Sequence, residues 1–212
     1  MPDHLILLHG LWMRGIALTA LRHRFEAAGF AVKPFDYMSV GAPLQQTLGE
    51  LRACIAATPG TVHVAGHSLG GLLALLACRG DTALPPGRIV CMGSPLTGSA
   101  TAQRLGELGG AWLLGHSQQA LEHGLDRWDG PREAGMIAGR VALGLGAMLG
   151  HIEGENDGTV PVAETRLPGL TDHCVVDTTH TGLLFSAEAA EAAIAFLRQG
   201  RFRTSARGGR VA

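Results

Sequence analysis

The feature that most constrains this chain is a serine flanked by glycines and placed between two apolar runs of different kinds. Residues 66–71 read Gly-His-Ser-Leu-Gly-Gly, after a β-like run at 61–65 and before a helix-like run at 72–78. At a strand-to-helix turn this tight the serine sits exposed on a strained tip, and the N–H groups of the helix N-terminus point toward it. Gly66 and Gly70 remove side chains that would collide as strand and helix meet. We therefore predict a strand-turn-helix unit with Ser68 as candidate nucleophile.

The other candidate catalytic residues follow in a recognisable order. Upstream, an apolar run at residues 5–8 leads into His9-Gly10; downstream, Asp157 begins Asp-Gly-Thr-Val and His180 begins His-Thr-Gly-Leu-Leu. The order Ser, Asp, His is that of α/β-hydrolases and differs from the orders of the two large serine-protease families. With these motifs the chain resembles the α/β-hydrolase superfamily, and within it the small bacterial lipases and esterases. The resemblance spans residues 4–199.

The resemblance assigns roles to particular residues. Ser68 would attack the substrate, His180 would act as general base, and Asp157 would hold the imidazole in the correct tautomer. For the base we prefer His180 over its competitors, and His67 is expected to be a packing residue; the competitors are His151 and His173. For the acid we prefer Asp157 over the other nearby carboxylates, which are Glu153, Glu155 and Asp177.

Backbone donors for an oxyanion hole are predicted from position along the chain. The residue after the nucleophile supplies one N–H, which is that of Leu69. By resemblance the turn after the first strand supplies the other, and this is the N–H of Leu11, with Trp12 as the alternative. Gly10 would let this backbone approach the substrate closely.

The order of predicted elements indicates an α/β fold with a doubly wound, mainly parallel sheet. Strands are expected near residues 5–8, 31–37, 61–66, 88–93, 135–141 and 173–178, and helices near 16–28, 43–57, 69–79 and 186–199. Alternating strands and helices of this kind give a parallel sheet covered on both faces. About six strands are expected, which is a reduced α/β-hydrolase fold without the antiparallel N-terminal strands of full-sized members.

An apolar insertion near residues 94–130 is longer than a simple crossover requires. It has two interpretations of equal weight: a cap or acyl-chain wall over the site, or a helix that covers one face of the sheet. On the first interpretation Trp112, Leu113 and Leu114, together with Trp12, would contact the substrate.

Composition fits one domain over residues 1–200, followed by a flexible arginine-rich tail at 201–212. The 212 residues are 46% hydrophobic and 17% charged, with a formal net charge of −1. This balance gives no basic face for nucleic acid.

The spacing of His63 and His67 does not suit a metal site, no phosphate-binding motif is present, and no cofactor is expected. The N-terminus does not read as a signal peptide, and the apolar residues 134–150 are too short and interrupted for a membrane span, so a cytoplasmic protein is expected.

The sequence therefore predicts a serine hydrolase that cleaves carboxylic esters, either small molecules or lipids, through an acyl-enzyme on Ser68. A thioesterase or acyltransferase would share the same residues, and so would a polyester or phospholipid hydrolase. A ligand-binding protein on a hydrolase fold is the alternative from another class, although such a protein has no need of all three catalytic residues. Oligomeric state is not readable from the sequence.

Overall fold

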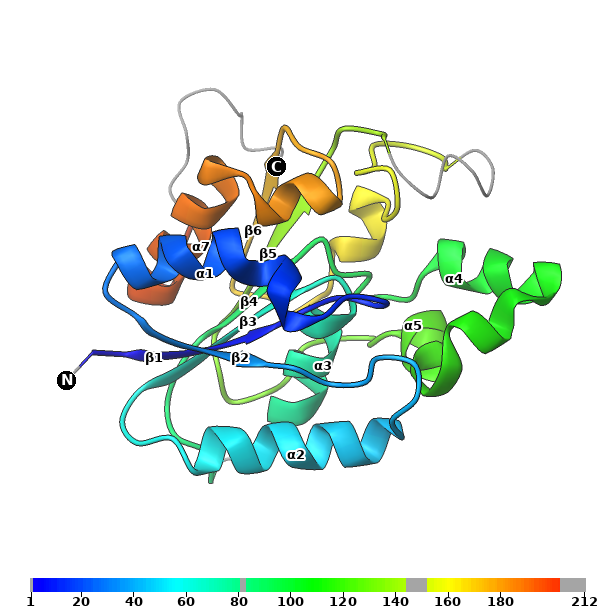
Figure 1. Cartoon of the computed structure of the whole chain (residues 1–212). Coiled ribbons are helices and arrows are strands. Elements are labelled where there is room, and N and C mark those ends of the chain that lie inside the picture. Colours follow the sequence, from blue (N-terminus) through cyan, green and yellow to red (C-terminus); the bar gives the residue numbers. More distant parts are fainter. Residues whose placement is uncertain (1, 81–82, 144–151, 203–212) are drawn as a thin grey trace.

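The computed structural model describes residues 2–80, 83–143 and 152–202. In these ranges six strands form one sheet in the order β2-β1-β3-β4-β5-β6, and each neighbouring pair is parallel (Figure 1). The strands are β1 (His4–Leu8), β2 (Ala31–Phe35), β3 (Val62–His67), β4 (Ile89–Met92), β5 (Ala134–Gly139) and β6 (Asp172–Val176). The prediction of a parallel sheet of about six strands is confirmed.

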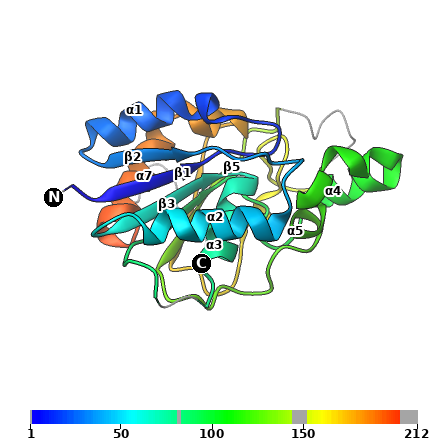
Figure 2. The same cartoon turned by 60° about the horizontal axis from the view of Figure 1, so that its bottom comes forward.

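Helices cover both faces of this sheet (Figure 1, Figure 2). α1 (Thr19–Ala27) and α7 (Ala187–Gln199) lie on one face, and α2 (Leu44–Ala56) and α3 (Leu69–Cys78) lie on the other. Side chains of β1 alternate between two cores: Leu5 and Leu7 pack with α1 and α7, whereas Ile6 and Leu8 pack with α2 and α3. Because both faces are buried, β1 is continuously apolar in sequence.

The insertion after β4 folds into a series of short helices. They are α4 (Ala100–Leu105), the π-helical η2 (Gly106–Gly110), η3 (Ala111–Leu113), η4 (Gly115–Ser117) and α5 (Gln118–His123). Both views place α4 and α5 beyond the carboxyl ends of the strands, not over a face of the sheet (Figure 1, Figure 2). Buried Ala102, Leu114 and Leu121 anchor the insertion in the core shared with α2 and α3. The insertion therefore stands at the edge where the strands end.

Three short 3-10 helices lie outside the sheet, the long helices and the insertion. η1 (Gly15–Leu18) precedes α1, η5 (Val162–Thr165) lies in the loop before β6, and η6 (Thr181–Leu184) precedes α7. None of the described helices has the length and apolar character needed to cross a membrane. The predicted tail at 201–212 lies outside the described residues from residue 203 onward.

Close packing of backbone distinguishes the junction between β3 and α3. A Cβ placed on Gly66 would lie 2.3 Å from the carbonyl carbon of Gly70, and one placed on Gly70 would lie 2.6 Å from the carbonyl oxygen of His9. Backbone atoms cannot move aside as a flexible side chain can, so only glycine fits at these two positions. The predicted collision between strand and helix is confirmed for Gly66; at Gly70 the collision would be with the end of β1 instead.

Substituting Gly66 by alanine should be costly for this reason. We expect Gly66→Ala to lower the free energy of unfolding by about 2 kcal/mol or more through overpacking. Gly49→Ala is the matched control, because Gly49 lies on the exposed side of α2 with nothing within 4 Å of its added Cβ. The control should gain about 0.5–1 kcal/mol from the higher helix propensity of alanine. Urea unfolding measures both, and equal losses in the two variants would contradict the packing argument.

Candidate active site

Ser68 lies at the tip of the junction between β3 and α3 in a strained backbone conformation. Its φ is 54° and its ψ is −123°, and Trp12 is the only other described residue besides glycine with a positive φ. Such a conformation costs of order 1–3 kcal/mol and persists only where the surroundings enforce it. Here Ser68 N donates to Met92 O at 2.8 Å and Ser68 O accepts from Gly71 N at 3.1 Å. Its side chain is partly exposed at the carboxyl edge of the sheet.

Asp157 and His180 form a directly bonded pair. His180 Nδ1 donates to Asp157 Oδ2 at 2.8 Å, and the backbone N–H of His180 donates to Asp157 O at 2.8 Å. The carboxylate is 1% exposed, and its other oxygen accepts from Thr159 N at 3.0 Å and Val160 N at 2.7 Å. With its proton on Nδ1, the imidazole has Nε2 left as an unprotonated base.

His67 connects the serine turn to the histidine segment. His67 Nε2 donates to His180 O at 2.9 Å, and the two imidazole ring centroids are 4.7 Å apart. Ser68 is the next residue in the chain, so its backbone is close to the segment that carries His180, although within the described chain no hydrogen bond joins the serine hydroxyl to His180. Such bonds are often long before substrate binds. The structure thus bonds two of the three predicted catalytic residues to each other, and the third is the chain neighbour of a residue that contacts them.

Two backbone N–H groups near Ser68 are available as donors. In the described residues neither Leu11 N nor Leu69 N has a hydrogen-bond acceptor, whereas Trp12 N donates to Ser39 Oγ at 3.1 Å. A Cβ placed on Gly10 would lie 3.1 Å from Ser68 Cβ, so this turn passes directly beside the serine. Of the two alternatives for the second oxyanion donor, the geometry favours Leu11.

The competing acids and histidines have other partners. The side chain of Asp177 is 69% exposed and pairs with Arg140. Arg140 Nη1 also lies 3.9 Å from Glu155 Oε1. His173 Nε2 contacts Thr165 Oγ1 at 2.8 Å, and burial lowers the pKa of His173 to about 4. His151 lies outside the described residues.

The predicted substrate-binding residues divide into exposed and buried positions. Trp12 is 51% exposed and Trp112 is 74% exposed. Trp12 Nε1 donates to Leu113 O at 2.9 Å, so the turn after β1 is tied directly to the insertion. Leu114 is only 2% exposed and belongs to the core. Contact with substrate stays a prediction for all four residues. Trp12 and Trp112 are the two whose large side chains are exposed and available for such a contact.

Sequence reasoning missed Glu164, which joins the insertion to the loop that carries Asp157. Glu164 Oε1 accepts from Ala100 N at 2.8 Å at the start of α4, and Thr101 Oγ1 donates to Thr159 O at 2.7 Å. Burial raises the pKa of Glu164 to about 7, and the charge of Asp157 acts in the same direction. No spacing in the sequence marks this contact, because its partners are more than fifty residues apart.

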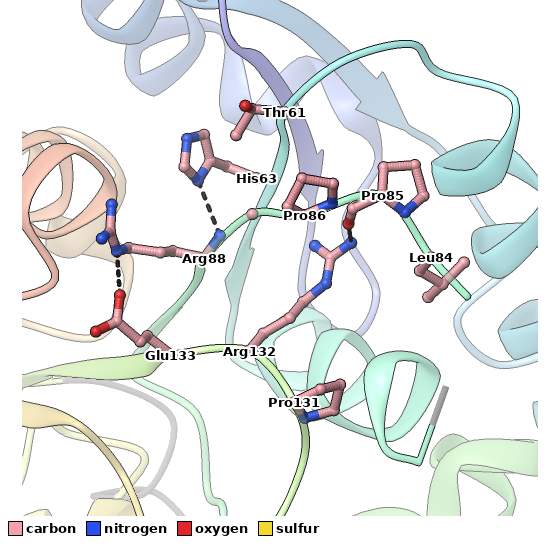
Figure 3. Close-up of a pocket in the computed structure, with 10 residues that line it drawn as sticks. Thr61, His63, Leu84, Pro85, Pro86, Arg88, Pro131, Arg132 and Glu133 are labelled. Atoms are coloured by element: carbon pink, nitrogen blue, oxygen red, sulfur yellow. Dashed lines mark hydrogen bonds and ion pairs between the residues drawn. The ribbon is translucent and has the colours of Figure 1, made fainter. Parts of the chain in front are cut away.

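A cavity of about 590 Å³ lies at the opposite edge of the sheet, where the strands begin (Figure 3). His63, Arg88, Arg132 and Glu133 in its lining have partners within the protein. Arg88 N donates to His63 Nδ1 at 2.9 Å, Arg88 Nε donates to Glu133 Oε2 at 2.5 Å, and Arg132 donates to the carbonyl of Pro85. The cavity is remote from Ser68, which follows the end of β3.

Similarity to known proteins is found in a family model and in solved structures. The model described as the alpha/beta hydrolase family matches residues 5–204. No curated protein sequence matches the chain. The mature form of the lipase BlEst2 from Bacillus licheniformis superposes with a TM-score of 0.71 at 19% identity, covering 95% of each chain.

Two esterases are also similar in structure. A metagenomic carboxyl esterase gives a TM-score of 0.63 at 18% identity, over 84% of this chain and 64% of that one. Polyneuridine aldehyde esterase gives 0.62 at 14% identity, over 94% of this chain and 100% of that one. At these identities the similarity is one of fold.

The burial of His67 predicts a pH dependence of stability. Desolvation, with a smaller contribution from His180, lowers the pKa of His67 from 6.5 to about 3. Between these values the unfolded chain binds a proton that the folded chain does not, so this contribution to stability is complete above pH 6.5 and is lost as the pH falls. His67→Gln removes this titration and keeps an amide donor for His180 O. The slope of unfolding free energy against pH should be shallower in the variant by up to about 1.4 kcal/mol per pH unit. Urea unfolding from pH 7 downward measures it, and identical slopes would be the contrary result.

Proposed function

The chain belongs to the alpha/beta hydrolase family, and from this we propose that it is a serine hydrolase of carboxylic esters, with Ser68 as nucleophile, His180 as general base and Asp157 as the acid that orients it. One observation carries the proposal: a buried carboxylate is bonded at 2.8 Å to an imidazole, and that imidazole lies 4.7 Å, between ring centroids, from His67, the residue next to a strained, partly exposed serine. A purely structural serine needs neither the strain nor the pair.

The proposed reaction follows from these positions. Ser68 Oγ attacks the ester carbonyl carbon while His180 Nε2 takes the hydroxyl proton. The carbonyl oxygen becomes an oxyanion that accepts hydrogen bonds from Leu11 N and Leu69 N. The bond to the alcohol then breaks, His180 returns its proton to the leaving oxygen, and a water molecule repeats the sequence on the acyl-enzyme. Buried Asp157 stabilises the imidazolium in both halves of the reaction.

Two observations favour an ester with an apolar acyl group. The similar solved structures include a lipase and two esterases. In addition, large apolar side chains are exposed on segments at the carboxyl edge; these include Trp12, Met38, Leu108 and Trp112. An apolar rim of this kind suits the burial of an acyl chain next to Ser68.

Removing the nucleophile is the primary test. Ser68→Ala should abolish hydrolysis of p-nitrophenyl esters while the far-ultraviolet spectrum and melting temperature stay close to those of the wild type. Ser94→Ala is the control, because Ser94 Oγ is buried near α3 and has no hydrogen-bond partner among the described residues. Activity in Ser68→Ala near that of Ser94→Ala would refute the proposal.

The choice of acid is tested by a matched pair of substitutions. Asp157→Asn should lower kcat by about 10³-fold to 10⁴-fold, because the imidazole loses its orienting carboxylate and the stabilisation of its cation. Asp177→Asn changes an exposed carboxylate only three residues from His180 and should leave kcat within about twofold, since surface pairs contribute little. Steady-state kinetics on one ester measures both, and a larger loss in Asp177→Asn would reassign the acid.

The insertion is tested through chain-length preference. If Trp112 and Leu113 line an acyl wall, each buried methylene adds up to about 0.8 kcal/mol, or up to about fourfold in kcat/KM per carbon. Trp112→Ala combined with Leu113→Ala should flatten this slope from acetate to octanoate, provided that melting shows a folded protein. Proportional losses on all esters would mean that the segment does not contact the acyl chain.

A further inference from the structure

His67 is the last residue of β3, and its imidazole is bonded on one side only. The residue is 1% exposed, and Nε2 lies 2.9 Å from His180 O. Nδ1 is also buried and has no hydrogen-bond partner among the described residues. Burying an acceptor without a partner in the protein costs up to about 3 kcal/mol, which an apolar side chain at the same place would avoid. Packing, the role expected from the sequence, therefore does not account for a histidine at this position.

The contact with His180 O determines where His67 carries its proton. A carbonyl oxygen can only accept, so Nε2 must be the donor. Burial, with a smaller contribution from the charge of His180, lowers the pKa of His67 to about 3, so the ring carries a single proton near neutral pH. That proton is on Nε2, and Nδ1 is unprotonated. Both observations describe the same neutral tautomer.

His180 is held by its backbone as well as by its ring. Its N–H donates to Asp157 O at 2.8 Å, its Nδ1 donates to Asp157 Oδ2 at 2.8 Å, and its carbonyl accepts from His67. The two bonds to Asp157 fix the base against the acid, but neither involves the serine turn at residues 66–71. Among the hydrogen bonds of the described residues, the one from His67 joins that turn to His180.

His67 is itself fixed to the sheet. It pairs with Met92 of β4, and the N–H of Ser68 donates to Met92 O at 2.8 Å. A Cβ placed on Gly10 would lie 3.3 Å from His67 Nδ1, so the ring also packs against the turn after β1. Because consecutive Cα atoms are only about 3.8 Å apart, one rigid side chain links the backbone beside Ser68 to the backbone of His180. The position of the base relative to the nucleophile thus depends on this side chain.

The neutral state of His67 suits this place. In the proposed reaction His180 becomes an imidazolium, and the centroid of its ring is 4.7 Å from that of His67. A second cation at this distance would oppose proton transfer from Ser68 to His180. Neutral His67 supplies a donor to the His180 segment without adding a like charge.

We propose that His67 is a positioning residue of the catalytic centre: its Nε2–H holds the carbonyl of His180 and so sets the distance between Ser68 Oγ and His180 Nε2. The inference rests on the proposed function, because this distance matters only if Ser68 reacts. Misplacing a reacting group by about 1 Å can cost about 10²-fold in rate. The role of His67 is exerted through His180, not on the substrate.

A pair of substitutions of nearly equal size separates positioning from packing. Gln and Met both replace the ring by an unbranched side chain, but the amide of Gln keeps a donor for His180 O and Met has none. We expect His67→Gln to lose about tenfold or less in kcat and His67→Met to lose about 10²-fold, with little change in KM in either variant. Met buries no unpaired polar group, so His67→Met should melt no lower than His67→Gln. Equal losses in kcat, or losses confined to KM, would overturn the positioning role.

Hydrogen exchange of the backbone tests the contact without turnover. The N–H of His180 should exchange about tenfold faster in His67→Met than in His67→Gln, because the His180 segment is released at its carbonyl. Amides of β5 are the control and should exchange alike in the two variants. Equal exchange at His180 would overturn the proposal. If the wild type hydrolyses no ester, the proposed function fails while this comparison stands.

The tautomer of His67 is tested in the wild-type protein itself. In nitrogen-15 NMR at pH 7, Nε2 of His67 should show the shift of a protonated ring nitrogen and Nδ1 that of an unprotonated one. The resonances are assigned by their absence in His67→Gln. A proton on Nδ1 in place of Nε2 would overturn the proposal, because Nε2 could then not donate to His180 O.

Discussion

The close approach of α3 to the end of β3 is the constraint on which the rest of the site depends. Backbone atoms of α3 approach Gly66 at a distance that only glycine permits, and Gly70 of α3 lies comparably close to the end of β1. To turn from strand to helix in so little space, the chain must pass through Ser68 with a positive φ. The same packing leaves Leu69 N at the start of α3 without an acceptor in the described chain. Strain at the serine and a free donor beside it thus have one cause.

The parallel sheet explains why distant segments meet at this turn. All six described strands end at the same edge, so the residues that follow β1, β4 and β6 reach Ser68 without long excursions. Asp157 is buried, and its carboxylate is satisfied by two backbone N–H groups and His180. Burial without these donors would be costly, and with them the pair is rigid.

The sequence predicted the elements that repeat a local pattern and missed contacts that cross between strands. Apolar runs located β1 and β3, and glycine spacing located the serine turn, because both report burial over a few neighbouring residues. The contacts of His9 with Asp36 and Tyr37 were not predicted, because these residues lie nearly thirty positions from His9 and no periodicity links a ring nitrogen to a carboxylate just after the neighbouring strand β2. Leu114 was predicted to contact substrate together with Trp112, although Leu114 is buried in the core. The short helices of the insertion do not share one helical period, so the sequence could not show which of their side chains are buried.

The central claim is that hydrolysis passes through Ser68, and site-resolved covalent labelling tests it most directly. The wild-type protein would be titrated with a fluorophosphonate, and at each point residual esterase activity would be compared with the fraction of Ser68 modified, measured by peptide mass spectrometry. Residual activity and unmodified Ser68 are expected to fall together, with the adduct on Ser68 alone. Loss of activity with the adduct on another residue, or a modified Ser68 with activity retained, would contradict it.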